Sequence, residues 1–89
     1  MSEFQIAETK GFEKRKKGFA PELYEKVVTV VYSQLRRNPY FGPNIKKLKG
    51  KLSPYYRFRI GSYRLFYLIE AEKVLVVVVD LKHRQNAYK

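Results

Sequence analysis

Cysteine is absent from this chain of 89 residues, so neither a disulfide framework nor a thiolate metal site is available to it. No apolar run is long enough to span a bilayer, and the first residues lack the charged and apolar regions of a secretory signal. Repeats, low-complexity segments and linkers are also missing. We therefore expect a single domain over residues 1–89, a cytoplasmic location and no membrane partner.

Acidic residues are missing from half of the chain. None occurs between Lys26 and Ile69, although the whole chain carries a formal net charge of +11. The cations of this stretch are Lys26, Arg36, Arg37, Lys46, Lys47, Lys49, Lys51, Arg57, Arg59 and Arg64. A surface kept basic only for solubility usually mixes both signs. Unbalanced positive charge instead attracts polyanions, so nucleic acid, the ribosome or an acidic protein are the expected partners.

The first half of the chain predicts one strand and two helices. Hydrophobic residues make up 45% and aromatic residues 16% of the chain, which argues for a folded domain. Residues 4–7 alternate weakly, as in a short strand, and residues 9–17 predict a charged helix capped by Thr9. A second helix opens at Pro21 and ends before Pro39. Its expected apolar stripe is Leu23, Val27, Val30, Val31 and Leu35.

The second half predicts a three-stranded antiparallel meander. Residues 40–53 read as a basic loop, after which apolar residues alternate with period two over residues 55–60. Turns at 61–62 and 70–73 then separate strands at 63–69 and 74–79. Six consecutive apolar residues at 74–79 indicate a strand covered on both faces. The expected fold class is α+β, with both helices packed on one face of one sheet.

The hairpin around the turn at 61–62 places Arg59 directly opposite Arg64. Side chains alternate across a sheet, so Arg57, Arg59, Arg64 and Phe66 share the face away from the core. Facing like charges repel, and an anion between two arginine forks relieves that repulsion. Two solvated arginines that splay apart are the alternative.

The last strand runs back to the same end of the sheet, so its continuation delivers His83, Arg84 and Tyr88 there. Arginines, a histidine and a tyrosine suit RNA cleavage by the neighbouring 2′-hydroxyl. That reaction needs a base, cations for the phosphorane and an acid for the leaving 5′-oxygen. We expect no cofactor and no metal site, because His83 is the one histidine and the carboxylates are scattered.

Residues 46–88 resemble the RelE/ParE toxin superfamily. The resemblance lies in Lys47-Leu48-Lys49-Gly50, in the string from Tyr56 to Leu65, and in His83-Arg84-Gln85-Asn86-Ala87-Tyr88. It implies a compact α+β toxin encoded beside an antitoxin, and the acid-free stretch from Lys26 to Ile69 predicts that this partner is acidic. The resemblance to RelE-type members further implies cleavage of mRNA in the ribosomal A site, which leaves a 2′,3′-cyclic phosphate and a 5′-hydroxyl.

The resemblance also implies residue roles. Arg64 corresponds to a phosphate-stabilising arginine, Arg84 to a second functional arginine, and Tyr88 to a tyrosine that positions or activates the 2′-hydroxyl. Arg57 and Arg59 stand where well-studied members carry lysines, which leaves the proton carrier open, and His83 is one candidate. The expected catalytic set is Arg59, Arg64, His83, Arg84 and Tyr88, and the expected RNA-binding set is Lys46, Lys47, Lys49, Lys51, Arg57 and Phe66.

Two alternatives remain open. A ParE-like member would inhibit DNA gyrase by protein contact, without nuclease activity. A non-catalytic RNA-binding module would explain the charge but not the convergent tail.

Overall fold

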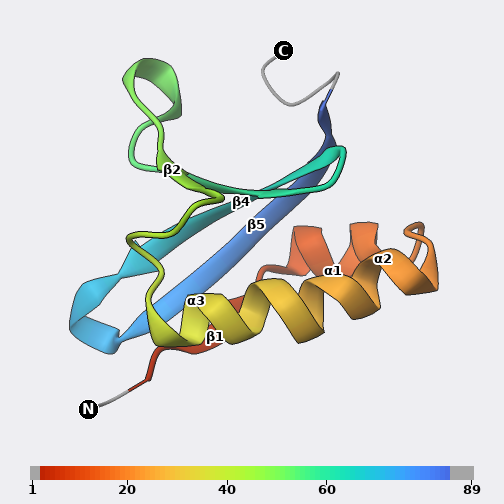
Figure 1. Ribbon diagram of the computed structural model, residues 1–89, viewed down its shortest axis with the longest axis horizontal. Coiled ribbons are helices and arrows are strands. Elements are labelled where there is room, and N and C mark those ends of the chain that lie inside the picture. The colour runs from red at the N-terminus through yellow and green to blue at the C-terminus, as the bar shows by residue number, and fades with distance from the viewer. Residues whose placement is uncertain (1–2, 85–89) are drawn as a thin grey trace.

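The computed structural model describes residues 3–84, which form an α+β domain with the helices on one side of a single sheet (Figure 1). The strand order is β1-β5-β4-β3-β2. The strands are Gln5–Glu8 (β1), Ile45–Lys47 (β2), Tyr56–Ile60 (β3), Tyr63–Glu70 (β4) and Leu75–His83 (β5). The α+β class and the one-sided helical layer are confirmed. Tyr88 lies outside the described residues.

The helical layer contains the two helices that the sequence predicts. The first is Lys10–Lys16 (α1), and the side chain of its cap Thr9 accepts a hydrogen bond of 3.1 Å from the amide of Phe12. The second opens at Pro21 and consists of three successive segments, Pro21–Lys26 (α2), Val27–Tyr32 (η1) and Ser33–Arg37 (α3). Within residues 3–84, none of the helices has the length and apolarity needed to cross a membrane.

The middle segment of the second helix, η1, is a π-helix, and it changes which valines are buried. Hydrogen bonds from i to i+5 place more residues in each turn than the 3.6 of an α-helix. Residues late in the segment are therefore rotated relative to an α-helix. Tyr32 is buried, whereas Val30 is 49% exposed. The expectation that Val30 belongs to the apolar stripe was wrong for this reason.

The sheet has two more pairings than the predicted meander. β1 joins it parallel to β5, with Ile6 opposite Val76. Inside the stretch read as a loop, β2 pairs antiparallel with β3 and places Ile45 opposite Phe58. Three residues are too few to show a period-two pattern, so this edge strand could not be predicted from the sequence. The sheet is consequently five-stranded and mixed.

β5 differs from expectation in length and in covering. It runs on to His83 through an irregularity opposite Phe66 and Tyr67, where Val79 is the extra residue. Val74 is excluded from the strand, because it closes the 3₁₀ turn Ala71–Lys73 (η3) in a left-handed conformation. The helices cover only one face of β5, so the expectation of a strand covered on both faces was wrong (Figure 1).

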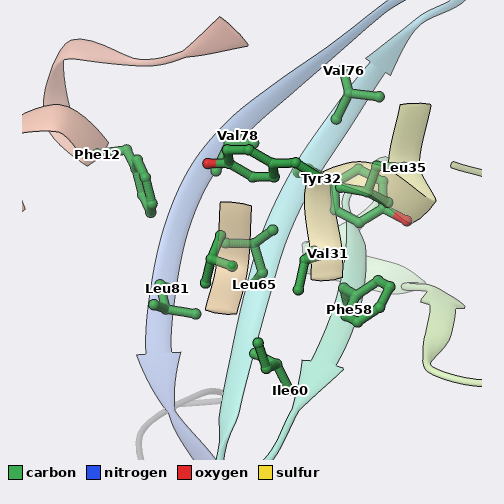
Figure 2. Packing of buried hydrophobic residues seen from close by; sticks show 12 residues of the cluster. Phe12, Val31, Tyr32, Leu35, Phe58, Ile60, Leu65, Val76, Val78 and Leu81 are labelled. Carbon is green, nitrogen blue, oxygen red and sulfur yellow. The ribbon is translucent and has the colours of Figure 1, made fainter. Parts of the chain in front are cut away.

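The core lies between the helices and the covered face of the sheet (Figure 2). Val31 and Leu35 of the second helix meet Phe58, Leu65 and Val78 of the sheet there. Complete burial of such side chains stabilises a fold by about 1.5–3 kcal/mol each.

Glu8, at the end of the edge strand β1, forms hydrogen bonds with three helical segments. Its carboxylate accepts hydrogen bonds of 2.7 Å from Lys16 Nζ of α1, from the Tyr24 hydroxyl of α2 and from the Tyr32 hydroxyl of η1. Burial by itself raises the pKa of Glu8, but the hydrogen bonds from these partners outweigh it and lower the pKa. Burial beside Glu8 also raises the pKa of Tyr32. The charged carboxylate is therefore the form that the fold stabilises.

Candidate nucleic-acid interface

The hairpin of β3 and β4 has the predicted register, with Arg59 directly opposite Arg64. The turn between them begins at Gly61, whose φ of 57° is the left-handed conformation that glycine adopts without strain. β5 extends this row, because Lys82 lies opposite Arg64. Three cations from three adjacent strands thus form one row across the sheet.

The next row along the same face runs Lys46, Arg57, Phe66 and Asp80 across β2, β3, β4 and β5. Neither row faces the helices, because the residues between them, such as Phe58 and Leu65, fill the core. We call the five cations of the two rows the basic face: Lys46, Arg57, Arg59, Arg64 and Lys82.

Arg64 is the most deeply placed cation of the basic face, with 9% of its surface exposed. Its Nη1 donates a hydrogen bond of 3.2 Å to the Tyr63 carbonyl. Its Nε is buried and, among the described residues, finds no hydrogen-bond acceptor. An unsatisfied buried donor costs about 1–3 kcal/mol, so the free protein holds this arginine at an energetic disadvantage. An anion that accepts from Nε would remove that cost.

Arg57 repeats the arrangement one row away. Its Nη1 donates to the Asn44 carbonyl at 3.2 Å, while its buried Nε also lacks an acceptor in the described part of the chain. Two guanidinium groups with open donors on one face suit a phosphate, whose oxygens accept several hydrogen bonds at once.

A small apolar cluster lies among the cations of the basic face, on the open side of the sheet. Phe66 is 7% exposed and packs with Leu48, and Tyr55 lies against both. The connection that carries Leu48 and Tyr55 folds over the sheet here and is tied by the hydrogen bond from the Leu48 amide to the Tyr55 carbonyl, 2.9 Å. This connection therefore covers the ring of Phe66, which lies between Arg57 and Asp80 on the open face, and leaves little of the ring exposed for contact with an RNA base.

The predicted lysines of the β2 region are distributed differently. Lys46 lies on the basic face, whereas Lys47 points to the other side of β2, with its Nζ 6.0 Å from the Tyr56 ring centroid. Lys49 and Lys51 are exposed at the 3₁₀ turn Gly50–Leu52 (η2), on the connection that extends beyond the sheet (Figure 1).

The end of β5 reaches the hairpin turn as predicted. The Arg84 amide donates to the Ser62 carbonyl at 2.6 Å, so this residue lies beside the turn that carries Arg59 and Arg64. His83, however, pairs with Tyr63 and contacts its ring edge-on, with centroids 5.3 Å apart. The pair of Tyr63 and His83 directly follows the pair of Arg64 and Lys82 along the two strands, so His83 lies at the edge of the basic face. The position of Tyr88 falls outside residues 3–84.

Asp80 and Lys82 are site residues that sequence reasoning missed. Asp80 is fixed by Arg15 Nη1 of α1 at 3.0 Å and by the amide of Leu81 at 2.9 Å, and it lies 4.0 Å from Lys82 Nζ. Strict alternation along β5 from Val76 would place Asp80 and Lys82 on the core face. The extra residue Val79 shifts the alternation by one, so both residues lie on the open face instead.

Comparisons with known proteins identify the family of this chain. Residues 10–88 match the profile of the family described as the ParE toxin of the type II toxin–antitoxin system parDE. The chain belongs to this toxin family. Toxin RelG of Mycobacterium tuberculosis is 32% identical over 69 residues, which cover 78% of this toxin and 77% of RelG.

Solved structures show the same fold. The structure of the toxin–antitoxin complex RelBE2 from Mycobacterium tuberculosis contains a chain that superposes with a TM-score of 0.83 at 27% identity, with 97% of each chain covered. The archaeal RelE–RelB complex from Pyrococcus horikoshii gives 0.75 at 22% identity, with 98% of this toxin and 100% of that chain covered. A mutant of Escherichia coli RelE in the free state gives 0.75 at 24%, with 98% and 88% covered.

Proposed function

We propose that this toxin is a ribosome-dependent endoribonuclease that cleaves mRNA in the ribosomal A site by attack of the 2′-hydroxyl on the adjacent phosphate. The observation that carries the proposal is the buried Arg64, whose Nε has no acceptor in the described part of the chain and whose strand neighbours are Arg59 and Lys82. Such a donor is preorganised before any charge develops, which is what transition-state stabilisation requires.

The residues of the basic face divide the chemistry as follows. Arg64 and Arg59 hold the scissile phosphate and stabilise the phosphorane, while Arg57 and Lys46 bind the adjoining backbone. The 2′-oxygen forms a bond to phosphorus, its proton passes to a base, and the bond from phosphorus to the 5′-oxygen breaks as an acid protonates that oxygen. The products are a 2′,3′-cyclic phosphate and a 5′-hydroxyl.

Proton transfer needs groups other than the arginines, which hardly deprotonate. Lys82 lies in the row of Arg59 and Arg64 and is our candidate for protonating the 5′-oxygen, with His83 at the rim as the second candidate. Tyr88 is retained from the sequence as the residue that positions or activates the 2′-hydroxyl. Arg84, beside the turn, contributes further positive charge.

The proposed RNA contacts extend along the β2 region. Lys47, Lys49 and Lys51 would bind ribosomal or messenger phosphates, and Phe66 would contribute to RNA binding by holding the connection of Leu48 and Tyr55 in place. The partners are thus mRNA, the ribosome and a cognate acidic antitoxin. The proposed reaction uses neither cofactor nor metal, in line with a sequence without cysteine and with one histidine.

Gyrase inhibition is the second candidate, because the matching family profile carries the ParE name. Primer extension on messages in a translating extract separates the two. We expect cuts within ribosome-bound messages for wild type and for Arg37→Ala, which removes an exposed charge from the second helix. Arg64→Ala should lose about 10²–10³ in cleavage rate. Uncut messages together with inhibited supercoiling by gyrase would favour the ParE-like function.

A further inference from the structure

One carboxylate stands among the cations of the basic face. The chain has eight acidic residues, and Asp80 is the one that lies in the two rows, opposite Phe66 and next to the row of Lys82. A surface that only attracts RNA has no use for an anion, because a carboxylate repels the phosphates that the arginines bind. The position of Asp80 therefore indicates a role other than RNA binding.

Asp80 is oriented from outside the basic face. Its Oδ1 accepts a hydrogen bond of 2.9 Å from the amide of Leu81, and its Oδ2 accepts one of 3.2 Å from Nη1 of Arg15 in α1. Its side chain is 21% exposed. A carboxylate has about four lone-pair sites, so acceptor sites remain open on a group that a substrate can reach.

Two features of the fold produce this placement. The edge strand β1 ends at Glu8, so in the described chain the rest of β5 has no strand on that side, and α1 packs against it instead. The extra residue Val79 turns Asp80 onto the open face. Arg15 thus reaches around the edge of the sheet to hold a carboxylate that lies among the cations.

The proposed cleavage requires a proton acceptor that the cations do not supply. An arginine hardly deprotonates, and a lysine that protonates the leaving oxygen must itself be charged. Asp80 is the diagonal neighbour of Arg64 across β5 and β4, and diagonal neighbours lie about 7–8 Å apart, within reach of long side chains. A nucleotide whose phosphate is bound by Arg64 therefore lies next to the carboxylate.

We propose that Asp80 is the general base that takes the proton from the 2′-hydroxyl. The proposal deepens the function proposed above and rests on it. As the proton moves to a carboxylate oxygen of Asp80, the 2′-oxygen forms its bond to phosphorus, the bond from phosphorus to the 5′-oxygen breaks, and Lys82 protonates that oxygen. Asp80 then releases its proton to water, and Lys82 regains one. Tyr88 is left with the positioning of the 2′-hydroxyl.

The base and the acid lie on the same strand, so Lys82 must move when RNA binds. In the free protein its Nζ lies 4.0 Å from Oδ2 of Asp80. The attacking and leaving oxygens lie on opposite sides of phosphorus, so the ammonium turns away from Asp80 to reach the leaving oxygen. The side chain of Lys82 is long and 36% exposed, which permits that rotation.

A purely structural role explains Asp80 less well. The ion pair with Arg15 connects α1 to the sheet, but the arginine is 51% exposed, and such pairs contribute little to stability. A role confined to holding Lys82 for proton donation is separated from that of a base by the choice of substrate.

The test is single-turnover cleavage on programmed ribosomes by Asp80→Asn, with Glu70→Gln as the matched control. Asparagine has the same shape and still accepts from the Leu81 amide, but it does not take up the proton. We expect Asp80→Asn to lose about 10²–10⁴ in rate. Glu70→Gln removes a carboxylate at the opposite end of β4 from the hairpin and should stay within about twofold of wild type. Arg15→Ala breaks the ion pair but keeps the carboxylate, so it should cost less than about tenfold.

The leaving group separates a base from a residue that only holds the acid. An RNA with sulfur in place of the leaving 5′-oxygen needs no acid, so it should restore the rate of Lys82→Ala, whereas the loss in Asp80→Asn should persist. If Asp80→Asn unfolds, Asp80→Ser also keeps an acceptor for the Leu81 amide and should show the same loss.

A rate for Asp80→Asn no lower than that of Arg15→Ala, or its rescue by the sulfur substrate, would overturn the assignment of the base. Messages left uncut by wild type would overturn the proposed function and the base with it. Cleavage by wild type that Asp80→Asn leaves intact would overturn the base alone.

Discussion

Replacement of Arg64 by methionine should leave the free toxin about as stable as wild type while it destroys cleavage. Methionine retains an unbranched side chain that fills the space of the arginine stem but carries no charge. Release of the unsatisfied Nε contributes about 1–3 kcal/mol, and relief of the repulsion from Arg59 contributes about 0.2–1 kcal/mol. Loss of the hydrogen bond from the charged guanidinium to the Tyr63 carbonyl costs about 1.5–3 kcal/mol.

The gains and the loss nearly cancel, so we expect the free energy of unfolding of Arg64→Met to lie within about 1 kcal/mol of wild type, and its Tm within about 4–8 °C for a domain of this size. Thermal unfolding followed by circular dichroism measures the difference in Tm. Inorganic phosphate should raise the Tm of wild type but not that of the variant, since bound ligand stabilises the folded state. A variant that is clearly less stable, or that cleaves at the wild-type rate, would refute the reasoning.

Three further outcomes are expected. Lys82→Ala should slow single-turnover cleavage by about 10²–10⁴ if Lys82 is the acid. An RNA substrate with sulfur in place of the leaving 5′-oxygen needs no proton on its leaving group, so it should restore the rate of the variant. A loss of rate that this substrate does not restore would contradict the assignment. Glu8→Gln should lower the free energy of unfolding near neutral pH by about 1–3 kcal/mol. Because the folded-state pKa of Glu8 is lowered, this difference should be fully present above the ordinary glutamate pKa and vanish as pH falls through the folded value; a pH-independent difference in urea unfolding would count against it. Val74→Gly should raise Tm, because a β-branched residue at a φ of 51° costs about 1–3 kcal/mol; an unchanged or lower Tm would argue that the turn is unstrained.

The hairpin could be predicted from sequence because several local signals agree. Tyr56, Phe58 and Ile60 alternate with arginines, Gly61 marks the turn, and the register follows from the turn length. The same logic placed Arg84 beside the turn, because a meander returns its last strand to the starting end.

The remainder depended on features without a local sequence signal. The π-helix arises in a run of valines that an α-helical wheel treats as regular, so Val30 was assigned to the core. The bulge at Val79 changes face assignment in β5 and so concealed Lys82. The burial of Arg64 results from tertiary packing and could not be predicted from its residue type, because arginine is almost never fully buried unless it is paired.

Cleavage of a single message on programmed ribosomes tests the central claim most directly. The message is labelled, the A-site codon is positioned, and purified toxin is added in excess over ribosomes for single-turnover conditions. We predict cuts within the A-site codon whose upstream fragments end in a 2′,3′-cyclic phosphate, with Arg64→Met reducing the rate about 10²–10³. Intact A-site messages with active wild-type toxin, or cleavage that Arg64→Met leaves unchanged, would contradict the account.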